Sequence, residues 1–259
     1  MNHLFDLTGK VCLVTGGNSG IGIGMAEGLV QHGASVIIWG RSADKNAAAV
    51  ERLKAHGGQV RSAVVNVGDE AEVKAAMAAI FNEFGRIDQA IANAGISIPT
   101  KDVFDIALDD FRRMQDVNVY GVLTTLREAA RNMVERHKAG DSGGSLVAVA
   151  STAAIHGAAR NEHYGATKGA VVAMMRAMAV ELAPKGIRAN TICPGWIRSD
   201  MTTGLQAWDK FNDNVISRVP VGGWGDGEDF AGMAVYLASK ASRFHTGDTI
   251  VIDGGYTIY

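Results

Sequence analysis

The sequence predicts an α/β fold in which a doubly wound parallel sheet of seven strands carries helices on both faces. Two observations predict it. Short runs rich in Val and Ile alternate with longer segments of helical period, the order expected of strand–helix units. The apolar runs do not alternate strictly with polar residues, as expected for strands that are covered on both sides. No repeat, low-complexity tract or linker divides the 259 residues, so we expect a single domain over residues 1–259.

Each expected element has a local signal in the sequence. The segment 69–84 has an acidic start, which suits the positive end of a helix dipole. The segment 109–137 is longer than an ordinary helix, and we expect it to be broken once. The strands are expected at 10–15, 35–39, 60–67, 87–92, 145–150, 188–193 and 249–252, and the helices at 44–56, 69–84, 109–137, 164–183 and 226–237.

The composition excludes several functional classes. Hydrophobic residues make up 47% of the chain, charged residues 20%, and the net charge is −2, so nothing indicates a nucleic-acid or membrane partner. The N-terminal residues lack a basic stretch followed by an apolar one, so no secretory signal is expected and a cytoplasmic location is favoured. Cys12 and Cys193 lie in apolar runs and are expected to be buried thiols. No histidine and carboxylate cluster has metal-site spacing.

A glycine-rich loop follows the first expected strand and opens a helix. Gly16 permits a tight turn, Gly20 lets the backbone approach a pyrophosphate, and Gly22 lets the helix pack closely on the strand. The helix N-terminus offers free N–H groups and a partial positive charge to an anion. This strand–turn–helix context predicts a dinucleotide site of the Rossmann type.

The spacing of this loop and six further matches resemble the short-chain dehydrogenase/reductase family over nearly the whole chain. The loop has the pattern Gly-x-x-x-Gly-x-Gly, preceded by Thr15. Tyr164 and Lys168 form the family's Tyr-x-x-x-Lys, and Ser151 lies thirteen residues before the tyrosine. Asn118 matches the family's fourth catalytic position. The remaining matches are the segments 93–95, 193–195 and 252–255.

The resemblance implies catalysis by Asn118, Ser151, Tyr164 and Lys168. Hydride transfer at an alcohol carbon needs a group that exchanges the hydroxyl proton, and Tyr164 would be that general acid and base. Lys168 lies four residues later on the same helical face. Its ammonium, together with the charge of the oxidised nicotinamide, would lower the tyrosine pKa. Ser151 would orient the substrate oxygen, and Asn118 would fix a water on a proton path from Lys168 to solvent.

The second strand ends in residues that favour NADP(H) over NAD(H). Gly40 stands where an acidic residue would bind the ribose hydroxyl of NAD, and Arg41 offers a planar fork of donors to a 2′-phosphate, with Ser42 beside it. NAD(H) stays open, because Ser19 replaces the basic residue that many NADP-using members carry there. Asn66 stands where the family has Asp, and its amide oxygen can still accept from the adenine amino group.

The resemblance assigns a set of cofactor-binding residues. The backbone of Ile197 and the hydroxyl of Ser199 are expected to meet the nicotinamide carboxamide. The full expected set is Gly16, Asn18, Ser19, Gly20, Ile21, Gly22, Gly40, Arg41, Ser42, Asn66, Val67, Asn93, Ala94, Gly95, Tyr164, Lys168, Pro194, Gly195, Ile197 and Ser199.

The substrate side is expected to lie around Ser151 and Tyr164. The segment 201–220 mixes aromatic and polar residues and departs from the strand–helix alternation, so we expect it to form a lid over the substrate. Residues near the catalytic group or in this lid complete the expected substrate set, which is Ser151, Ala153, His156, Tyr164, Trp196, Leu205 and Trp208.

Three functions fit these motifs. The first is an NADP(H)-dependent oxidoreductase that interconverts a secondary alcohol and its ketone. The second is a 3-oxoacyl-[acyl-carrier-protein] reductase, with Arg127 and Arg131 as candidates for a basic patch that would meet the acidic carrier. The third is a non-catalytic dinucleotide sensor, which the intact catalytic motif disfavours. Apolar residues on more than one face of the helices 109–137 and 164–183, and the family resemblance, predict a homotetramer.

Overall fold

The expected sheet is present in the computed structural model, which describes residues 4–259. Seven parallel strands have the order β3-β2-β1-β4-β5-β6-β7, with register pairs such as Val11 to Ser35 and Cys12 to Gln89. The strands are β1 (Val11–Thr15), β2 (Ser35–Gly40), β3 (Val60–Val64), β4 (Gln89–Ala92), β5 (Gly144–Val149), β6 (Ile187–Pro194) and β7 (Thr249–Ile252).

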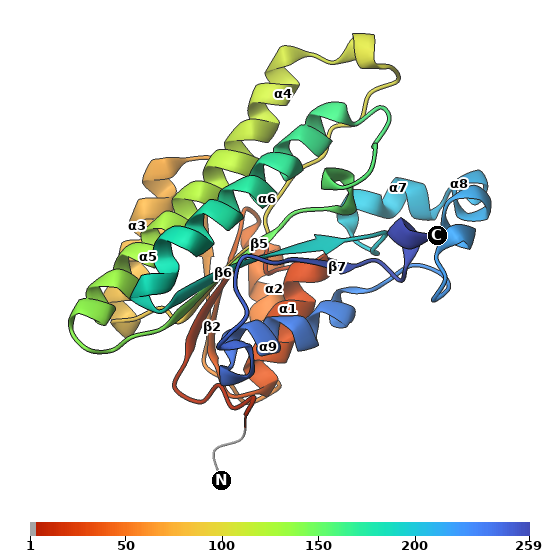
Figure 1. The fold of residues 1–259 in the computed structure, drawn as a ribbon. Helices are drawn as coiled ribbons and strands as arrows, with labels where there is room; N and C mark the ends of the chain where they lie inside the picture. Colours follow the sequence, from red (N-terminus) through yellow and green to blue (C-terminus); the bar gives the residue numbers. More distant parts are fainter. Residues whose placement is uncertain (1–3) are drawn as a thin grey trace.

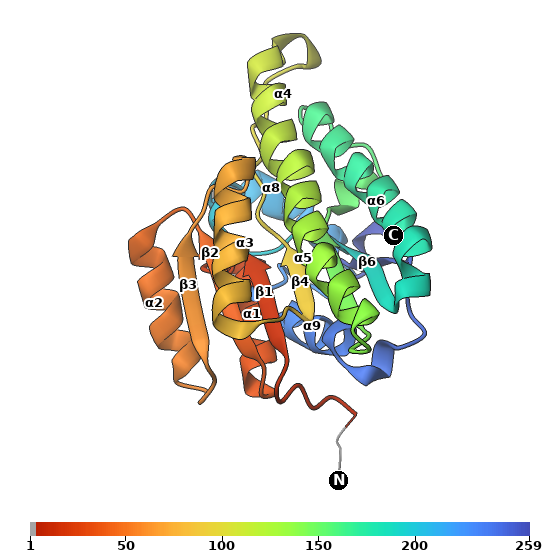
Figure 2. The ribbon, with the colours of Figure 1, turned by 90° about the vertical axis from the view of Figure 1, so that its left-hand side faces the viewer.

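Helices cover both faces of the sheet, which confirms the expected fold class (Figures 1 and 2). One apolar core joins the sheet to α3 (Glu70–Phe84), α5 (Gly121–Lys138) and α6 (Glu162–Leu182). A second core joins the other face to α1 (Gly20–Gln31), α2 (Ala43–Lys54) and α9 (Ala231–Ala238). Both cysteines are buried and free, as expected.

The long segment 109–137 is broken once, as the sequence predicted. Helix α4 (Leu108–Gln115) passes through one π-helical turn, Asp116–Tyr120, into α5. Such turns replace ordinary i→i−4 bonding locally and frequently mark functional sites. Asn118 lies in the middle of this turn and is fully buried.

Two strands are clearly shorter than expected: β4 begins at Gln89 and not at residue 87, and β3 ends early. The predicted strand 60–67 ends at Val64 because the next residues turn toward α3. The Asn66 N–H donates to the Glu72 carboxylate (2.7 Å), and the Gly68 N–H donates to Oδ1 of Asn66 (3.2 Å). Asp69 then accepts from two N–H groups of the first turn of α3 as its N-cap.

The segment 201–220 forms two short helices, α7 (Thr203–Gln206) and α8 (Asp209–Asn214), followed by a turn at Ile216–Arg218. They lie beside the C-terminus in Figure 1. The Val221 N–H donates to the carbonyl of Gly254 (3.0 Å), so the chain after the turn is tied to the C-terminal residues. Among residues 4–259, no helix combines the length and apolar character that crossing a membrane requires.

Candidate active site

The carboxyl ends of β1 and β4 meet where the strand order changes direction. In open α/β sheets this point is the usual ligand crevice. The hydroxyl of Thr15, at the end of β1, accepts from the N–H groups of Asn93 and Ala94 (3.0 Å each). The Asn93 amide donates to the carbonyl of Thr15 (3.0 Å). The expected residues of the glycine loop and of segment 93–95 therefore lie together.

The glycine loop has the close packing that a pyrophosphate cradle needs. Gly16 and Gly20 have positive φ of 63° and 50°. A Cβ on Gly22 would lie 2.1 Å from the carbonyl oxygen of Gly16, so only glycine fits there. A Cβ on Gly20 would lie 3.0 Å from Cβ of Ser199, which brings the loop next to the expected nicotinamide segment. These residues fit a dinucleotide.

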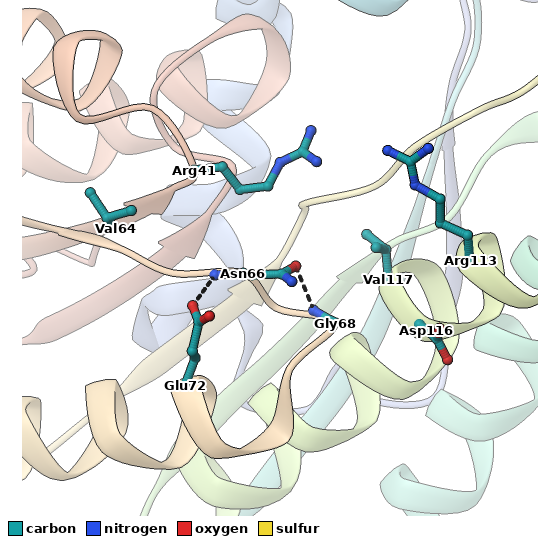
Figure 3. A pocket seen from close by; sticks show the side chains of 8 residues that line it. All are labelled: Arg41, Val64, Asn66, Gly68, Glu72, Arg113, Asp116 and Val117. Carbon is teal, nitrogen blue, oxygen red and sulfur yellow. Dashed lines mark hydrogen bonds between the residues drawn. The ribbon is translucent and has the colours of Figure 1, made fainter.

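A cavity of about 420 Å³ opens beyond the end of β2 (Figure 3). It contains the expected residues Arg41 and Asn66, while Val67 and Ser42 are not part of its lining. The Ser42 hydroxyl instead accepts from the Lys45 N–H (3.3 Å) and caps α2. The sequence reasoning missed the other lining residues, which are Val64, Gly68, Glu72, Arg113, Asp116 and Val117.

Two asparagine side chains fill the space around Gly40. The Asn18 amide donates to Oδ1 of Asn46 (2.7 Å), and Asn46 donates to the carbonyl of Gly40 (3.0 Å). A Cβ on Gly40 would lie 2.2 Å from Nδ2 of Asn18 and 2.5 Å from Oδ1 of Asn46. An acidic side chain at this position would therefore have to displace the two asparagine side chains, whereas Arg41 is exposed at the cavity.

The four expected catalytic residues converge at the carboxyl ends of β4 and β5. Tyr164 and Lys168 lie on α6, with the lysine Nζ 5.6 Å from the centroid of the tyrosine ring. The Ser151 hydroxyl hydrogen-bonds the Tyr164 phenol. The Lys168 Nζ donates to the carbonyl of Val149 (2.9 Å).

Asn118 is joined to the neighbouring loop by two hydrogen bonds. Its Nδ2 donates to the carbonyl of Ile96 and its Oδ1 accepts from the Ile96 N–H, both at 2.9 Å. A Cβ on Gly95 would lie 3.3 Å from both the Asn118 Oδ1 and the Lys168 Nζ. The π-helical turn thus places Asn118 beside Gly95 and the lysine.

Burial controls the acid–base behaviour of this group. It raises the pKa of Tyr164 to about 12, although the hydrogen bond from Ser151 acts in the opposite direction. It lowers the pKa of Lys168 to about 8. The sequence expected Lys168 and the nicotinamide charge together to lower the tyrosine pKa; the raised value belongs to the protein's own groups, in which desolvation has the largest influence, and the expectation for the complex with the cofactor stays a prediction. Burial also raises the pKa of Cys193, so this thiol is an unreactive neighbour of the site.

The expected nicotinamide segment follows β6 directly. Pro194 ends the strand, and Gly195 packs against Asp253, whose Cβ lies 2.6 Å from the position of an added Cβ. The Thr202 hydroxyl donates to the carbonyl of Ile197 (2.8 Å) and accepts from the Ser199 N–H (3.1 Å). Thr202 therefore holds the backbone of this segment.

An aromatic cluster occupies the substrate side. The ring of Trp196 meets those of Phe211, Trp224 and Tyr256 edge-on, with centroids 4.9, 6.3 and 6.1 Å away. Two expected substrate residues join it: Trp208 stacks on Phe211 and His156 contacts Tyr256. The sequence reasoning missed Phe211, Trp224 and Tyr256, because these rings come from distant segments. Ala153 lies beside Gly165 of α6, and Leu205 lies half-buried in α7.

The two arginines of α5 that were expected to bind an acyl carrier protein form ion pairs within the protein. Arg127 pairs with Glu70 and Glu128, and Arg131 pairs with Glu128. Both arginine side chains stay partly exposed, at 40% and 66%, so their role as a docking patch for an acidic carrier stays a prediction, although these neighbours on α3 and α5 offset part of their charge. Within residues 4–259, no group of three or more His, Cys, Asp or Glu side chains could hold a metal ion.

Known proteins resemble this chain over its whole length. Residues 16–257 match a family described as enoyl-(acyl carrier protein) reductase. Gluconate 5-dehydrogenase of Gluconobacter oxydans is 35% identical over 260 residues, covering 100% of this chain and 99% of that protein. The 3-oxoacyl-[acyl-carrier-protein] reductase FabG of Chlamydia pneumoniae is 34% identical, covering 97% and 98%.

A solved structure agrees with the fold in detail. The gluconate 5-dehydrogenase of Burkholderia cenocepacia, crystallised with NADP and tartrate, superimposes with a TM-score of 0.92 at 32% identity. The match covers 99% of this chain and 98% of that one. A short-chain type dehydrogenase/reductase from Mycobacterium marinum gives the same TM-score at 36% identity, with coverage of 99% and 98%.

Proposed function

Because this chain belongs to the short-chain dehydrogenase/reductase family, we propose that it is an NADP(H)-dependent oxidoreductase that interconverts a secondary alcohol and its ketone. The observation that carries the proposal is the convergence of Ser151, Tyr164 and Lys168 at the sheet edge that also bears the glycine loop. A dinucleotide sensor without activity has no need of this convergence.

The residues have complementary roles in this reaction. When bound, the nicotinamide supplies or accepts the hydride. The Tyr164 phenol gives its proton to the carbonyl oxygen in reduction and takes it back in oxidation. The Ser151 hydroxyl, already bonded to that phenol, donates to the substrate oxygen where negative charge develops. The Lys168 ammonium stabilises the phenolate, since its Nζ lies 5.6 Å from the ring centroid.

The preference for NADP(H) is supported by the end of β2. Asn18 and Asn46 fill the place of the acidic residue that an NAD-specific site would use, and Arg41 is exposed at the cavity. The related gluconate 5-dehydrogenase carries NADP in its crystal structure. Comparing the Michaelis constants for NADPH and NADH tests the assignment, and equal values or a lower value for NADH would refute it.

The substrate is best sought among hydroxy acids and related ketones, because two of the relatives are gluconate 5-dehydrogenases. A 3-oxoacyl-[acyl-carrier-protein] reductase is the second candidate, favoured by the FabG relative. The ion pairs of Arg127 and Arg131 with glutamates offset part of the positive charge of its expected docking patch and so favour the first candidate. A panel containing 5-ketogluconate, simple cyclic ketones and a 3-oxoacyl thioester, followed by NADPH absorbance, discriminates between them.

The control for this panel is Tyr164→Phe. It should keep NADPH binding, measured by fluorescence, and lose turnover on every substrate, because the ring is retained and only the exchangeable proton is removed. Turnover near that of the wild type would defeat the proton-transfer role.

We also propose a homotetramer as the working form. Val180 on α6 is 80% exposed and Tyr120 at the end of the π-helical turn is 55% exposed, so apolar side chains remain on the outer side of these helices. Sedimentation at micromolar concentration tests this, and a monomer would contradict it.

A further inference from the structure

Two arginines from distant parts of the sequence line the same cavity. Arg41 follows β2, and Arg113 lies in α4, one helical turn before Val117. Figure 3 shows the two guanidinium groups directed toward each other. The floor between them is formed by Asn66, Gly68 and Val117.

Neither arginine has a partner in the part of the chain that the structure describes. Within residues 4–259, the guanidinium groups of Arg41 and Arg113 make no hydrogen bond or ion pair. The adjacent Arg112 behaves differently, because it pairs with Asp109 at 2.7 Å. The cavity also has two carboxylates. The Glu72 carboxylate is engaged by the Asn66 N–H (2.7 Å) on the floor, and the Asp116 side chain points away from the guanidinium groups in Figure 3.

Two like charges that face each other across a small cavity repel, and an anion between them removes this repulsion. The guanidinium group is planar and binds phosphate oxygens through two parallel N–H donors, which makes arginine pairs suited to a doubly charged phosphate. Gly40, the residue before Arg41, adds no negative charge beside the cavity, and two asparagine side chains fill the space around it.

We propose that Arg113 is a second phosphate-binding residue, which closes with Arg41 on the 2′-phosphate of the adenosine part of the cofactor. It thereby determines the preference for the phosphorylated dinucleotide. This inference rests on the proposed function and extends it, because Arg113 belongs to α4 and not to the turn after β2 in which the specificity was expected. Its contribution depends on the tertiary contact between these two elements.

The test uses two ligands that differ only in the 2′-phosphate: adenosine 2′,5′-bisphosphate and adenosine 5′-monophosphate. Isothermal titration calorimetry at fixed ionic strength measures both for the wild type, Arg113→Met and Arg113→Gln. Arg112→Met is the matched control on the same helix. We expect either Arg113 substitution to weaken binding of the bisphosphate about tenfold or more, and binding of the monophosphate less than about twofold. Arg112→Met should change neither.

A second readout is the ratio of kcat/KM for NADPH to that for NADH, which should fall in the Arg113 variants by a similar factor. Equal weakening of both adenosine ligands would place Arg113 on the base and overturn the proposal, and so would unchanged binding. A wild-type protein that binds neither NADPH nor NADH would refute the proposed function itself. If the wild type uses NADPH but the Arg113 variants match it, only the phosphate clamp fails.

Discussion

The amino edge of the sheet contains one buried carboxylate whose removal should destabilise the fold. Asp88 is 7% exposed and lies directly before β4. It accepts from the N–H of Val11 (3.0 Å), from Lys10 Nζ (3.2 Å) and from Arg86 through two bonds of 2.9 and 2.7 Å. Arg136 at the end of α5 lies 3.5 Å away. One carboxylate therefore joins β1, β4 and α5.

We expect Asp88→Asn to lower the free energy of unfolding by about 2–4 kcal/mol. Breaking a buried ion pair costs about 3–5 kcal/mol, and we expect about 1 kcal/mol less here because Lys10 and Arg86 are 39% and 32% exposed. For a chain of this size the melting temperature should fall by about 5–15 °C. Differential scanning fluorimetry measures it. The control is Asp141→Asn, because Asp141 pairs with Arg86 and Arg136 but is half exposed.

The effect should also depend on pH. Burial alone raises the pKa of Asp88, but the hydrogen bonds from Arg86 and Val11 and the charge of Lys10 outweigh it, so the pKa is lowered. Its stabilisation is then complete above the unfolded-state pKa of about 4 and is lost as the pH falls through the folded-state value. The difference in melting temperature between the wild type and Asp88→Asn should therefore become smaller below about pH 4. The reasoning would be refuted if, at neutral pH, Asp88→Asn lowered the melting temperature no more than Asp141→Asn does.

Three other substitutions test the site. Burial lowers the pKa of Lys168 to about 8, so turnover should fall as the pH rises through this value and the ammonium loses its proton. The Lys168→Arg variant stays charged and should not show this fall. If its turnover fell over the same pH range, the titrating group would be another residue. Gly22→Ala should weaken NADPH binding about tenfold or more, because the added Cβ would lie 2.1 Å from the Gly16 carbonyl. Gly232→Ala, with no atom within 4 Å of its added Cβ, should bind NADPH normally, and calorimetry compares the two. Trp196→Ala removes three ring contacts. It should lower the free energy of unfolding by about 1–3 kcal/mol and raise KM for the ketone. An unchanged KM would show that the aromatic cluster does not contact the substrate.

The sequence by itself determined the elements whose signals are local. The glycine loop could be interpreted because a strand precedes it and a helix follows it within a few residues. Tyr164 and Lys168 were placed on one face because residues four apart are neighbours on any helix. The end of β2 was predicted in the same way, since Gly40 and Arg41 follow the strand directly.

The tertiary structure decided everything that depends on contacts between distant segments. Arg113 and Arg41 line one cavity only because the fold brings α4 near the end of β2. The aromatic rings around Trp196 come from positions between 156 and 256 that are far apart in the sequence. The direction in which the pKa of Tyr164 is shifted could be determined only from the fold, because the loss of water around a side chain depends on all the groups packed against it. Local pattern determines which groups are present, and packing determines their neighbours and their protonation.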